Sequence, residues 1–307
     1  MATWTSGSAD HIKQYAGFGE LVNRDTPLLR TFQAYGRVFD VTGKPSWPVY
    51  TTGVTAADIT EGTDISTFYY QVDVEATQPL VAKHLSVRLG AVAEAIAAAG
   101  GTLPNARENQ INFTIADSLK ALEAAFCASG QDIGLPSIND GTGTYAGIDP
   151  GSVTAWSSNE LTAVSSSING CVRSVLKEMS IDGANMNNLA IFAHPTARDK
   201  FQASAIASGS FVANSPPGGG PTDPGWFPES FRYNGYPVVA VNSLPEGDIH
   251  ILDMSDARID MLQYPQVKDI NGNSVDTKFA VTVMGCIRLQ SRNKHGKVFN
   301  VDSTTAY

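Results

Sequence analysis

The segment between Pro104 and Gly130 constrains the fold more than any other part of the chain. Asn105 with Glu108 three residues later is typical of a helix capping box, and Gly130 stands where a helix stop is expected. On a helix of 3.6 residues per turn, five apolar side chains fall within an arc of about 80°. They are Ile111, Ile115, Leu119, Leu122 and Phe126, while Phe113 lies on the polar side. The segment therefore predicts a helix of about 36 Å, which is long for a globular protein and suited to act as a strut in a chain of one elaborate unit or two domains.

A β-rich region precedes this helix. Residues 68–74 alternate as a strand does, so that one face would carry Phe68, Tyr70, Val72 and Val74. Residues 47–52 would form the opposing strand, and residues 56–65 read as a polar connection. A two-stranded ribbon is marginal in water, and this one has few apolar partners of its own. We therefore expect it to be covered by another molecule.

The remaining pattern alternates helices and strands. A stripe of apolar residues over 161–179 predicts a second helix, with cap candidates at 157–159, and a further helix opens at Pro195. The first 30 or so residues show no sustained period and read as an extended arm. The predicted strands are residues 189–193 and then a β-meander over 236–241, 248–254, 257–263, 278–289 and 297–301, with a turn at Asn271–Gly272.

Composition excludes several classes of protein. The 307 residues carry a net charge of −9 and no block of Lys or Arg, which argues against sequence-specific nucleic-acid binding. The longest apolar stretch, residues 90–101, is shorter than a membrane span of about 20 residues, and the first residues lack the pattern of a secretory signal. Cys127, Cys171 and Cys286 are isolated and read as reduced core residues. Only 17% of residues are charged, which suggests surface that faces other subunits.

The sequence contains no recognisable catalytic or cofactor motif. The five histidines show no metal-ligand spacing with one another or with the cysteines, so we expect no metal. Residues 141–147 lack the spacing of a dinucleotide loop and read as a surface loop, and residues 269–276 lack the glutamate and the length of a calcium loop. We expect no cofactor and no catalytic residues. Two carboxylates that converge in space cannot be recognised from one sequence, so a hydrolase stays open.

The order of these parts resembles the major capsid proteins of tailed bacteriophages, whose Hong Kong phage-type fold is shared with encapsulins. A single one of these motifs does not identify the family. The order and spacing of all the motifs together carry the resemblance, which extends over residues 35–301. The matching segments are residues 59–63 before the aromatic strand, 80–87 before the long helix, 127–136 after it, 190–199 at the start of the axial domain, and the later strands 235–239, 251–255 and 284–289.

The resemblance implies an α+β fold with named parts. These are an N-terminal arm over residues 1–30, an extended β-hairpin loop over 31–75, a peripheral domain over 76–192 with its spine helix at 105–129, an axial domain over 193–252, and C-terminal strands over 253–307 that return to the peripheral domain. The extended loop would contact neighbouring subunits. We assign these contacts to Trp47, Tyr50, Glu61, Phe68, Tyr69, Tyr70 and Val72.

The same resemblance implies a function. The chain would assemble with copies of itself into hexamers and pentamers of an icosahedral shell around double-stranded DNA. Partners would be a separate scaffolding protein, a portal and decoration proteins, with no membrane, and assembly in the host cytoplasm would lead to the virion. An encapsulin-like compartment is the alternative, and a soluble enzyme with an unrecognised active site is a weaker one.

Some relatives join a lysine of the extended loop to an asparagine of a neighbour. Lys44 is the only lysine between Thr31 and Ala82, and it stands in a sequence typical of a solvated turn. An amine becomes nucleophilic when an apolar pocket lowers its pKa, and this context does not suggest one. We therefore expect subunits that are held together without covalent cross-links.

Overall fold

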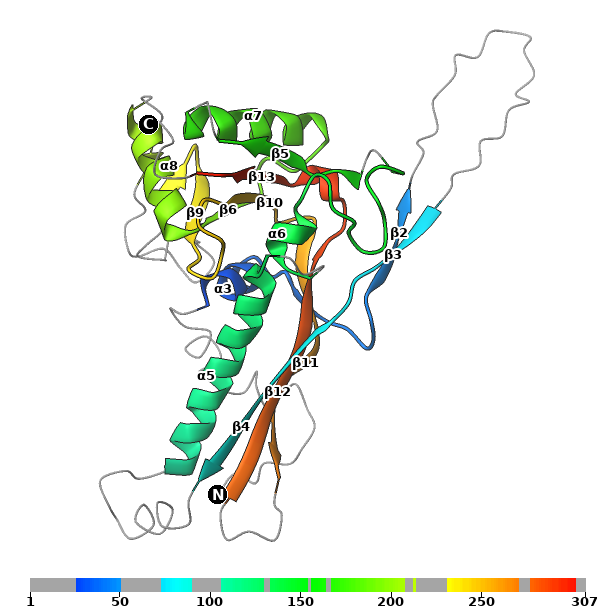
Figure 1. Cartoon of the computed structure of the whole chain (residues 1–307), viewed down its shortest axis with the longest axis vertical. Coiled ribbons are helices and arrows are strands. Elements are labelled where there is room, and N and C mark those ends of the chain that lie inside the picture. The colour runs from blue at the N-terminus through cyan, green and yellow to red at the C-terminus, as the bar shows by residue number, and fades with distance from the viewer. Residues whose placement is uncertain are drawn as a thin grey trace, which may run out of the picture.

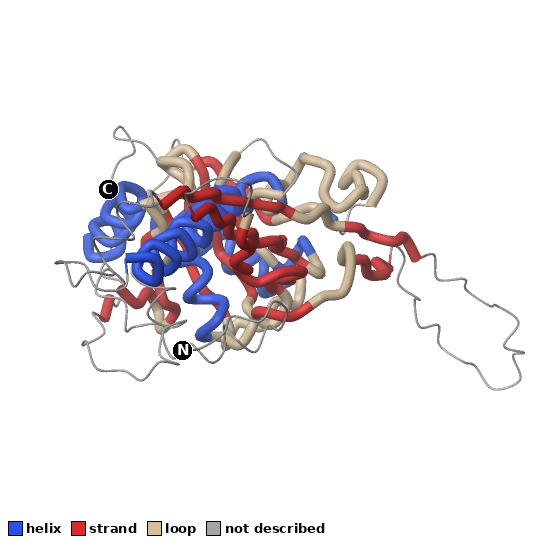
Figure 2. Tube along the Cα trace, turned by 90° about the horizontal axis from the view of Figure 1, so that it is seen from below, coloured by secondary structure: helices blue, strands red, loops and turns tan. Residues whose placement is uncertain are grey.

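A computed structural model gives the arrangement of the chain (Figure 1). It describes residues 26–50, 73–89, 106–129, 133–153, 156–163, 167–207, 212–213, 231–270 and 277–301. The described parts form a mixed α+β structure built around two sheets, and a two-stranded ribbon leaves the body on one side (Figures 1 and 2).

The larger sheet has seven strands. Their order is β5 (Asn159–Thr162), β13 (Gly296–Phe299), β10 (Ile249–Asp253), β6 (Leu189–Ala193), β9 (Tyr236–Ala240), β8 (Phe231–Tyr233) and β7 (Val212–Ala213). Every residue of β6 and β10 is buried. Helices α7 (Ile168–Ile181) and α8 (Pro195–Ala207) cover one face, on which Leu189 and Ile191 lie. Because strands buried on both faces need apolar residues throughout, β6 reads as a continuous apolar run.

The smaller sheet has four strands and one helix on its inner face. The order is β1 (Val38–Asp40), β11 (Ala257–Asp269), β12 (Thr277–Leu289) and β4 (Val81–Leu89). Helix α5 (Ala106–Cys127) crosses β4 and β12 and turns its apolar stripe to Phe279, Val281 and Val283. The stripe residues Ile111, Ile115, Leu119, Leu122 and Phe126 are all buried, whereas Phe113 is 67% exposed. The predicted long helix and both its faces are therefore confirmed.

Helix α3 (Pro27–Ala34) connects the two sheets. Its Leu28 and Phe32 are fully buried, and the Phe32 ring stacks on Phe192 of β6 at 6.1 Å between centroids. The backbone N–H of Leu29 donates to the Glu123 carboxylate of α5 at 3.0 Å, so a side chain of α5 caps the start of α3. The predicted arm over residues 1–30 therefore ends in a helix that belongs to the core, and residues 1–25 lie outside the described part of the chain.

Several local predictions are confirmed. The strand at residues 189–193 is β6, the helix opening at Pro195 is α8, and the five later strands all form. β11 and β12 pair as an antiparallel hairpin, and their predicted turn at Asn271–Gly272 lies outside the described residues. All three cysteines are buried and none forms a disulfide.

Other predictions are wrong. Residues 159–162 form strand β5 instead of the start of a helix, and α7 begins after an N-cap at Ser167, whose Oγ accepts from Gly170 N at 3.2 Å. The later strands are no meander, because they are divided between two sheets and β6 and β9 are parallel. β5, which precedes residue 193, and β13, near the C-terminal end of the described chain, both lie in the larger sheet. The expected domain bounds stay a prediction.

Candidate assembly surface

The base of the predicted extended loop is a ribbon of two strands, β2 (Ser46–Tyr50) and β3 (Asp73–Thr77). The strands pair antiparallel, with Val49 opposite Val74 and Trp47 opposite Ala76. The expected strand at residues 47–52 is present over 47–50, and Asp73 and Val74 of the expected strand 68–74 lie in β3. Residues 51–52 and 68–72 lie outside the described part of the chain. Figures 1 and 2 show the ribbon pointing away from both sheets.

Trp47 holds the ribbon to its own chain. It is 5% exposed, its indole N–H donates to the Gln290 carbonyl at 3.1 Å, and the Arg288 guanidinium lies 4.8 Å from its ring centroid. Its ring lies 6.2 Å from that of Tyr145, between centroids. Trp47 was expected to contact a neighbouring subunit. The side chain is largely buried in its own subunit, and its contact with a neighbour stays a prediction.

The other expected contact residues lie further out on the loop. Tyr50 is the last residue of β2, and the structure places its backbone only. Glu61, Phe68, Tyr69, Tyr70 and Val72 lie outside the described residues. The contacts of the outer loop therefore stay a prediction, whereas the structure shows how the two strands at its base are attached to the body.

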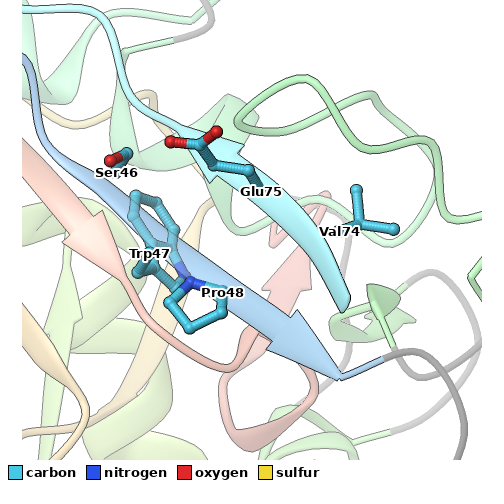
Figure 3. Close-up of a pocket in the computed structure, with 5 residues that line it drawn as sticks. All are labelled: Ser46, Trp47, Pro48, Val74 and Glu75. Carbon is cyan, nitrogen blue, oxygen red and sulfur yellow. The ribbon is translucent and has the colours of Figure 1, made fainter. Parts of the chain in front are cut away.

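A shallow cavity of about 330 Å³ lies at the ribbon base, lined by Ser46, Trp47, Pro48, Val74 and Glu75 (Figure 3). Its lining is mostly apolar and contains one ionisable group, the Glu75 carboxylate. Acid–base catalysis requires at least two groups that exchange protons with a bound molecule. The cavity can accept an apolar side chain, but its lining offers no such pair.

A buried ionic cluster lies beneath the ribbon. Asp260 is fully buried and pairs with Arg258 at 2.9 Å and with Arg288 at 3.4 Å. Burial raises the pKa of Asp260, and the charge and hydrogen bond of Arg258 act against this rise. The Phe39 ring lies 5.2 Å from the Arg258 guanidinium and 5.3 Å from that of Arg37. Phe39 belongs to β1, Arg258 and Asp260 belong to β11, and Arg288 belongs to β12. Because Arg288 also contacts the Trp47 ring, the cluster connects these three strands with the ribbon.

A second polar network joins the two sheets. His295 Nε2 lies 2.9 Å from Asp256 Oδ2, which also accepts from Ser291 N at 2.7 Å. Asp253 N donates to His295 Nδ1 at 3.2 Å, so this nitrogen is the acceptor and Nε2 carries the proton. Burial would raise the pKa of Asp256, but the hydrogen bonds from His295 and Ser291 outweigh it and lower the pKa.

The loop at residues 141–147 lies against Arg292 and also reaches the surface, where Thr142, Thr144 and Gly147 are exposed. Arg292 is fully buried and donates to the carbonyls of Ile138 at 2.8 Å and Gly143 at 2.5 Å. Tyr145 is also buried and stacks on Trp156 at 5.6 Å. These groups were missed because their partners are distant in sequence. The contacts of Arg292 and Trp156 stabilise the region around Tyr145, on which the Trp47 ring packs.

Within the described ranges, no group of three His, Cys, Asp or Glu side chains could hold a metal ion. Burial and, to a smaller extent, the charge of Lys297 together lower the pKa of His250 to about 3, so this histidine stays neutral between Asn139 and Asp248. In the same part of the chain, no helix is both long and apolar enough to cross a membrane.

Comparison with known proteins relates this architecture to solved structures. No family model and no curated protein matches the sequence. The capsid asymmetric unit of cyanophage A-1(L) matches with a TM-score of 0.66 and 17% identity over 90% of this chain and 92% of that chain. The capsid of a native GTA particle matches with a TM-score of 0.60 and 13% identity over 88% and 89%.

A compartment protein is similar as well. The SrpI encapsulin of Synechococcus elongatus matches with a TM-score of 0.60 and 12% identity over 99% of each chain. Each of these three similarities extends over most of both chains. The chain therefore has the Hong Kong phage-type fold found in the major capsid proteins of tailed bacteriophages.

Proposed function

We propose that the chain is a major capsid protein, which assembles with copies of itself into the hexamers and pentamers of an icosahedral shell around double-stranded DNA. The observation that carries this proposal is the match to the cyanophage A-1(L) capsid subunit over 90% of this chain and 92% of the other. The two chains are nearly coextensive, so the fold similarity is that of a whole subunit.

The ribbon supports the same function on physical grounds. Its base is fixed by Trp47 and by the bond from Thr77 N to the Ala146 carbonyl at 2.9 Å, while its strands leave the body. A ribbon that is fixed at its base and points away from the body is suited to reach another molecule. We propose that residues 51–72 lie on an adjacent subunit, with Tyr50, Glu61, Phe68, Tyr69, Tyr70 and Val72 as contacts.

The role is structural. The buried ionisable groups Glu123, Asp256, Asp260 and His295 each have partners within the fold, and none of them lines the cavity at the ribbon base. The shell would need a scaffolding protein, a portal and decoration proteins as partners. The chain would assemble in the host cytoplasm and reside in the virion, with DNA held without sequence specificity.

Electron microscopy of the purified protein tests the proposal. We expect closed shells or capsomer-sized rings, and a protein that remains monomeric under all assembly conditions would contradict it. Particles from the native source should contain double-stranded DNA, measured by nuclease protection.

The match to the SrpI encapsulin over 99% of each chain favours a second candidate function, a protein compartment. The content of the particles distinguishes the two. A packaged enzyme without protected DNA would show a compartment, and protected DNA would show a capsid.

A further inference from the structure

The ribbon meets the body at a tight turn over residues 145–148. Tyr145 N donates to the Ile148 carbonyl at 3.0 Å, and Ile148 N donates back to the Tyr145 carbonyl at 2.9 Å. The two central residues, Ala146 and Gly147, have φ angles of 52° and 82°. Two positive φ angles in a row are the geometry of a type I′ turn, in which asparagine and glycine are preferred. An alanine therefore occupies a position that this type of turn does not favour.

Ala146 is strained by its backbone conformation. The other described residues with a positive φ are glycines and two asparagines, Asn234 and Asn300, and asparagine tolerates this left-handed region better than alanine. Such strain persists only where the surroundings over-determine the conformation. Ala146 is 5% exposed, and the Trp156 indole N–H donates to the adjacent Tyr145 carbonyl at 3.1 Å. Because strained residues of this kind gather at functional sites, the turn is a candidate for a role beyond stability.

The turn contacts both strands of the ribbon. The Ala146 carbonyl accepts from Thr77 N, at the end of β3, at 2.9 Å. The Tyr145 ring lies 6.2 Å from the Trp47 ring of β2, between centroids. The turn is itself fixed to the four-stranded sheet, because the Tyr145 hydroxyl accepts from Leu289 N at 2.9 Å. One contact would let the ribbon rotate, whereas contacts to both strands define a direction.

We propose that the turn at residues 145–148 fixes the direction in which the extended loop leaves the subunit, with Ala146 as its positioning residue. The left-handed region open to alanine is a small well, whereas glycine has access to a broad range of positive and negative φ. Ala146 therefore holds its carbonyl, and with it the end of β3, in one orientation. This inference rests on the proposed function, because the direction of the loop matters only if copies of the chain assemble.

A change of direction at the base of the ribbon has a large effect further out. The ribbon points away from both sheets (Figure 1). Residues 51–61 can reach at most about 40 Å beyond Tyr50. A rotation of about 10° at the base would move a point at that distance by about 7 Å, which is more than the length of a hydrogen bond. Small changes at the turn therefore decide whether the loop meets its neighbour.

Spin-label distances in the unassembled subunit test the inference. Labels at Ala56→Cys in the loop and at Lys177→Cys on α7 report the direction of the ribbon through the width of their distance distribution. The Lys177 side chain is 74% exposed, and the three native cysteines are buried. Thr77→Pro removes the N–H that the Ala146 carbonyl accepts from, and it should widen the distribution about twofold or more.

Glu75→Pro is the matched control. The N–H groups of a strand alternate between its two edges, so that of Glu75 lies on the same edge of β3 as that of Thr77, and it donates to no described residue. This variant adds a proline to the same edge without breaking the contact with the turn, and its distribution should stay as narrow as in the unmodified subunit. Equal widths in Thr77→Pro and Glu75→Pro would overturn the inference.

Ala146→Gly separates positioning from stability. Glycine is unstrained at a positive φ, so the midpoint of urea denaturation should stay the same or rise. A purely stabilising role of the turn predicts an unchanged distance distribution in this variant, whereas a positioning role predicts a wider one. An unchanged width would overturn the inference, and this test holds even where Thr77→Pro fails to fold.

Particle shape tests the consequence for assembly. In electron micrographs, the share of closed shells should fall about fivefold or more in Thr77→Pro and stay the same in Glu75→Pro, because shells close only when the rotation between subunits is correct. Normal shells from Thr77→Pro subunits with widened distances would overturn the inference, since the direction of the loop would then not matter. If the unmodified protein forms no particles, the proposed function fails, and the distances in the subunit still decide whether the turn positions the ribbon.

Discussion

The two sheets differ in how completely their own chain covers them. In the seven-stranded sheet, β6 and β10 are buried at every position, with α7 and α8 on one face and α3 on the other. In the four-stranded sheet, α5 covers one face, and β4 is exposed at every second residue on the other. The central strands of the first sheet are buried within one subunit. The second sheet, with the ribbon beside it, has surface left for another molecule.

The sharpest test of this contrast compares two phenylalanines. Phe192→Ala in β6 should lower the free energy of unfolding by about 3–5 kcal/mol, because it leaves a cavity beside Phe32. Phe113→Ala on α5, where the side chain is 67% exposed, should change it by less than about 0.5 kcal/mol. Chemical denaturation of both variants measures the difference. Equal losses would show that the two regions are covered alike.

The second prediction concerns the base of the ribbon. Trp47→Ala should cost about 3 kcal/mol of unfolding free energy, because the ring packs on Tyr145 and Arg288. Trp47→Phe keeps a ring but loses the donor to the Gln290 carbonyl, and it should cost about 1 kcal/mol. Denaturation curves of the two variants check the order. If Trp47→Ala were neutral, the ribbon would not be fixed to its own subunit.

The third prediction concerns Glu123, which joins α5 of the half-covered region to α3. Burial raises the pKa of Glu123 to about 8, although the N–H groups of Leu28 and Leu29 lower it. The folded protein therefore binds a proton that the unfolded chain releases at lower pH, and the free energy of unfolding should fall as pH rises from about 4.5 to about 8.

Glu123→Gln removes this titration and keeps an oxygen for Leu29. The fall in unfolding free energy between pH 5 and pH 8 should be smaller in the variant by at least about 1 kcal/mol. Urea denaturation at the two pH values measures it. A pH dependence that is the same in Glu123→Gln would show that the fold does not raise the pKa of Glu123.

The fourth prediction separates folding from assembly. Phe68→Ser with Tyr70→Ser should change the unfolding free energy of the monomer by less than about 0.5 kcal/mol and yet abolish particles, because the aromatic face is expected to be buried on a neighbour. Phe113→Ser is the control and should leave particles intact. Electron microscopy measures particle formation, and chemical denaturation measures the unfolding free energy of the monomer. Normal particles from the double variant would show that the loop takes no part in assembly.

The smallest effect is expected at Lys44. Its side chain is exposed in the bend between β1 and β2, as the turn sequence predicted. Denaturing electrophoresis of particles should show a single band near 32.6 kDa, identical in Lys44→Ala. A ladder of larger bands that disappears in Lys44→Ala would show covalent cross-linking.

The sequence predicted what depends on local pattern. The stripe of α5, the strand β6 and the helix that begins at Pro195 each follow from residues within one segment, and all three are present. Residues 159–162 were read as helix because Leu161 fits the apolar stripe of α7. They form a strand because β13, more than 130 residues later, offers a parallel partner, with Leu161 opposite Val298. No local pattern carries that information.

The candidate surface was predictable only in part. Alternation indicated the ribbon, but it could not show that Trp47 turns to Tyr145 and Arg288 of its own chain. The buried networks around Arg292 and around Asp256 with His295 escaped notice for the same reason. Each pairs groups that are brought together only by tertiary structure. A histidine without metal-ligand spacing gives no sign of such a partner.

The position of β13 has a consequence for the order of events during protein synthesis. β13 lies between β5 and β10, so among the described strands β5 is joined to the large sheet through residues 296–299. A ribosome makes the chain from its N-terminus, and domains fold as their residues emerge. Nascent chains therefore cannot complete this sheet until residues 296–299 have been translated, well over a hundred residues after β5. A copy that lacks these residues would expose the edges of β5 and β10 that β13 otherwise joins.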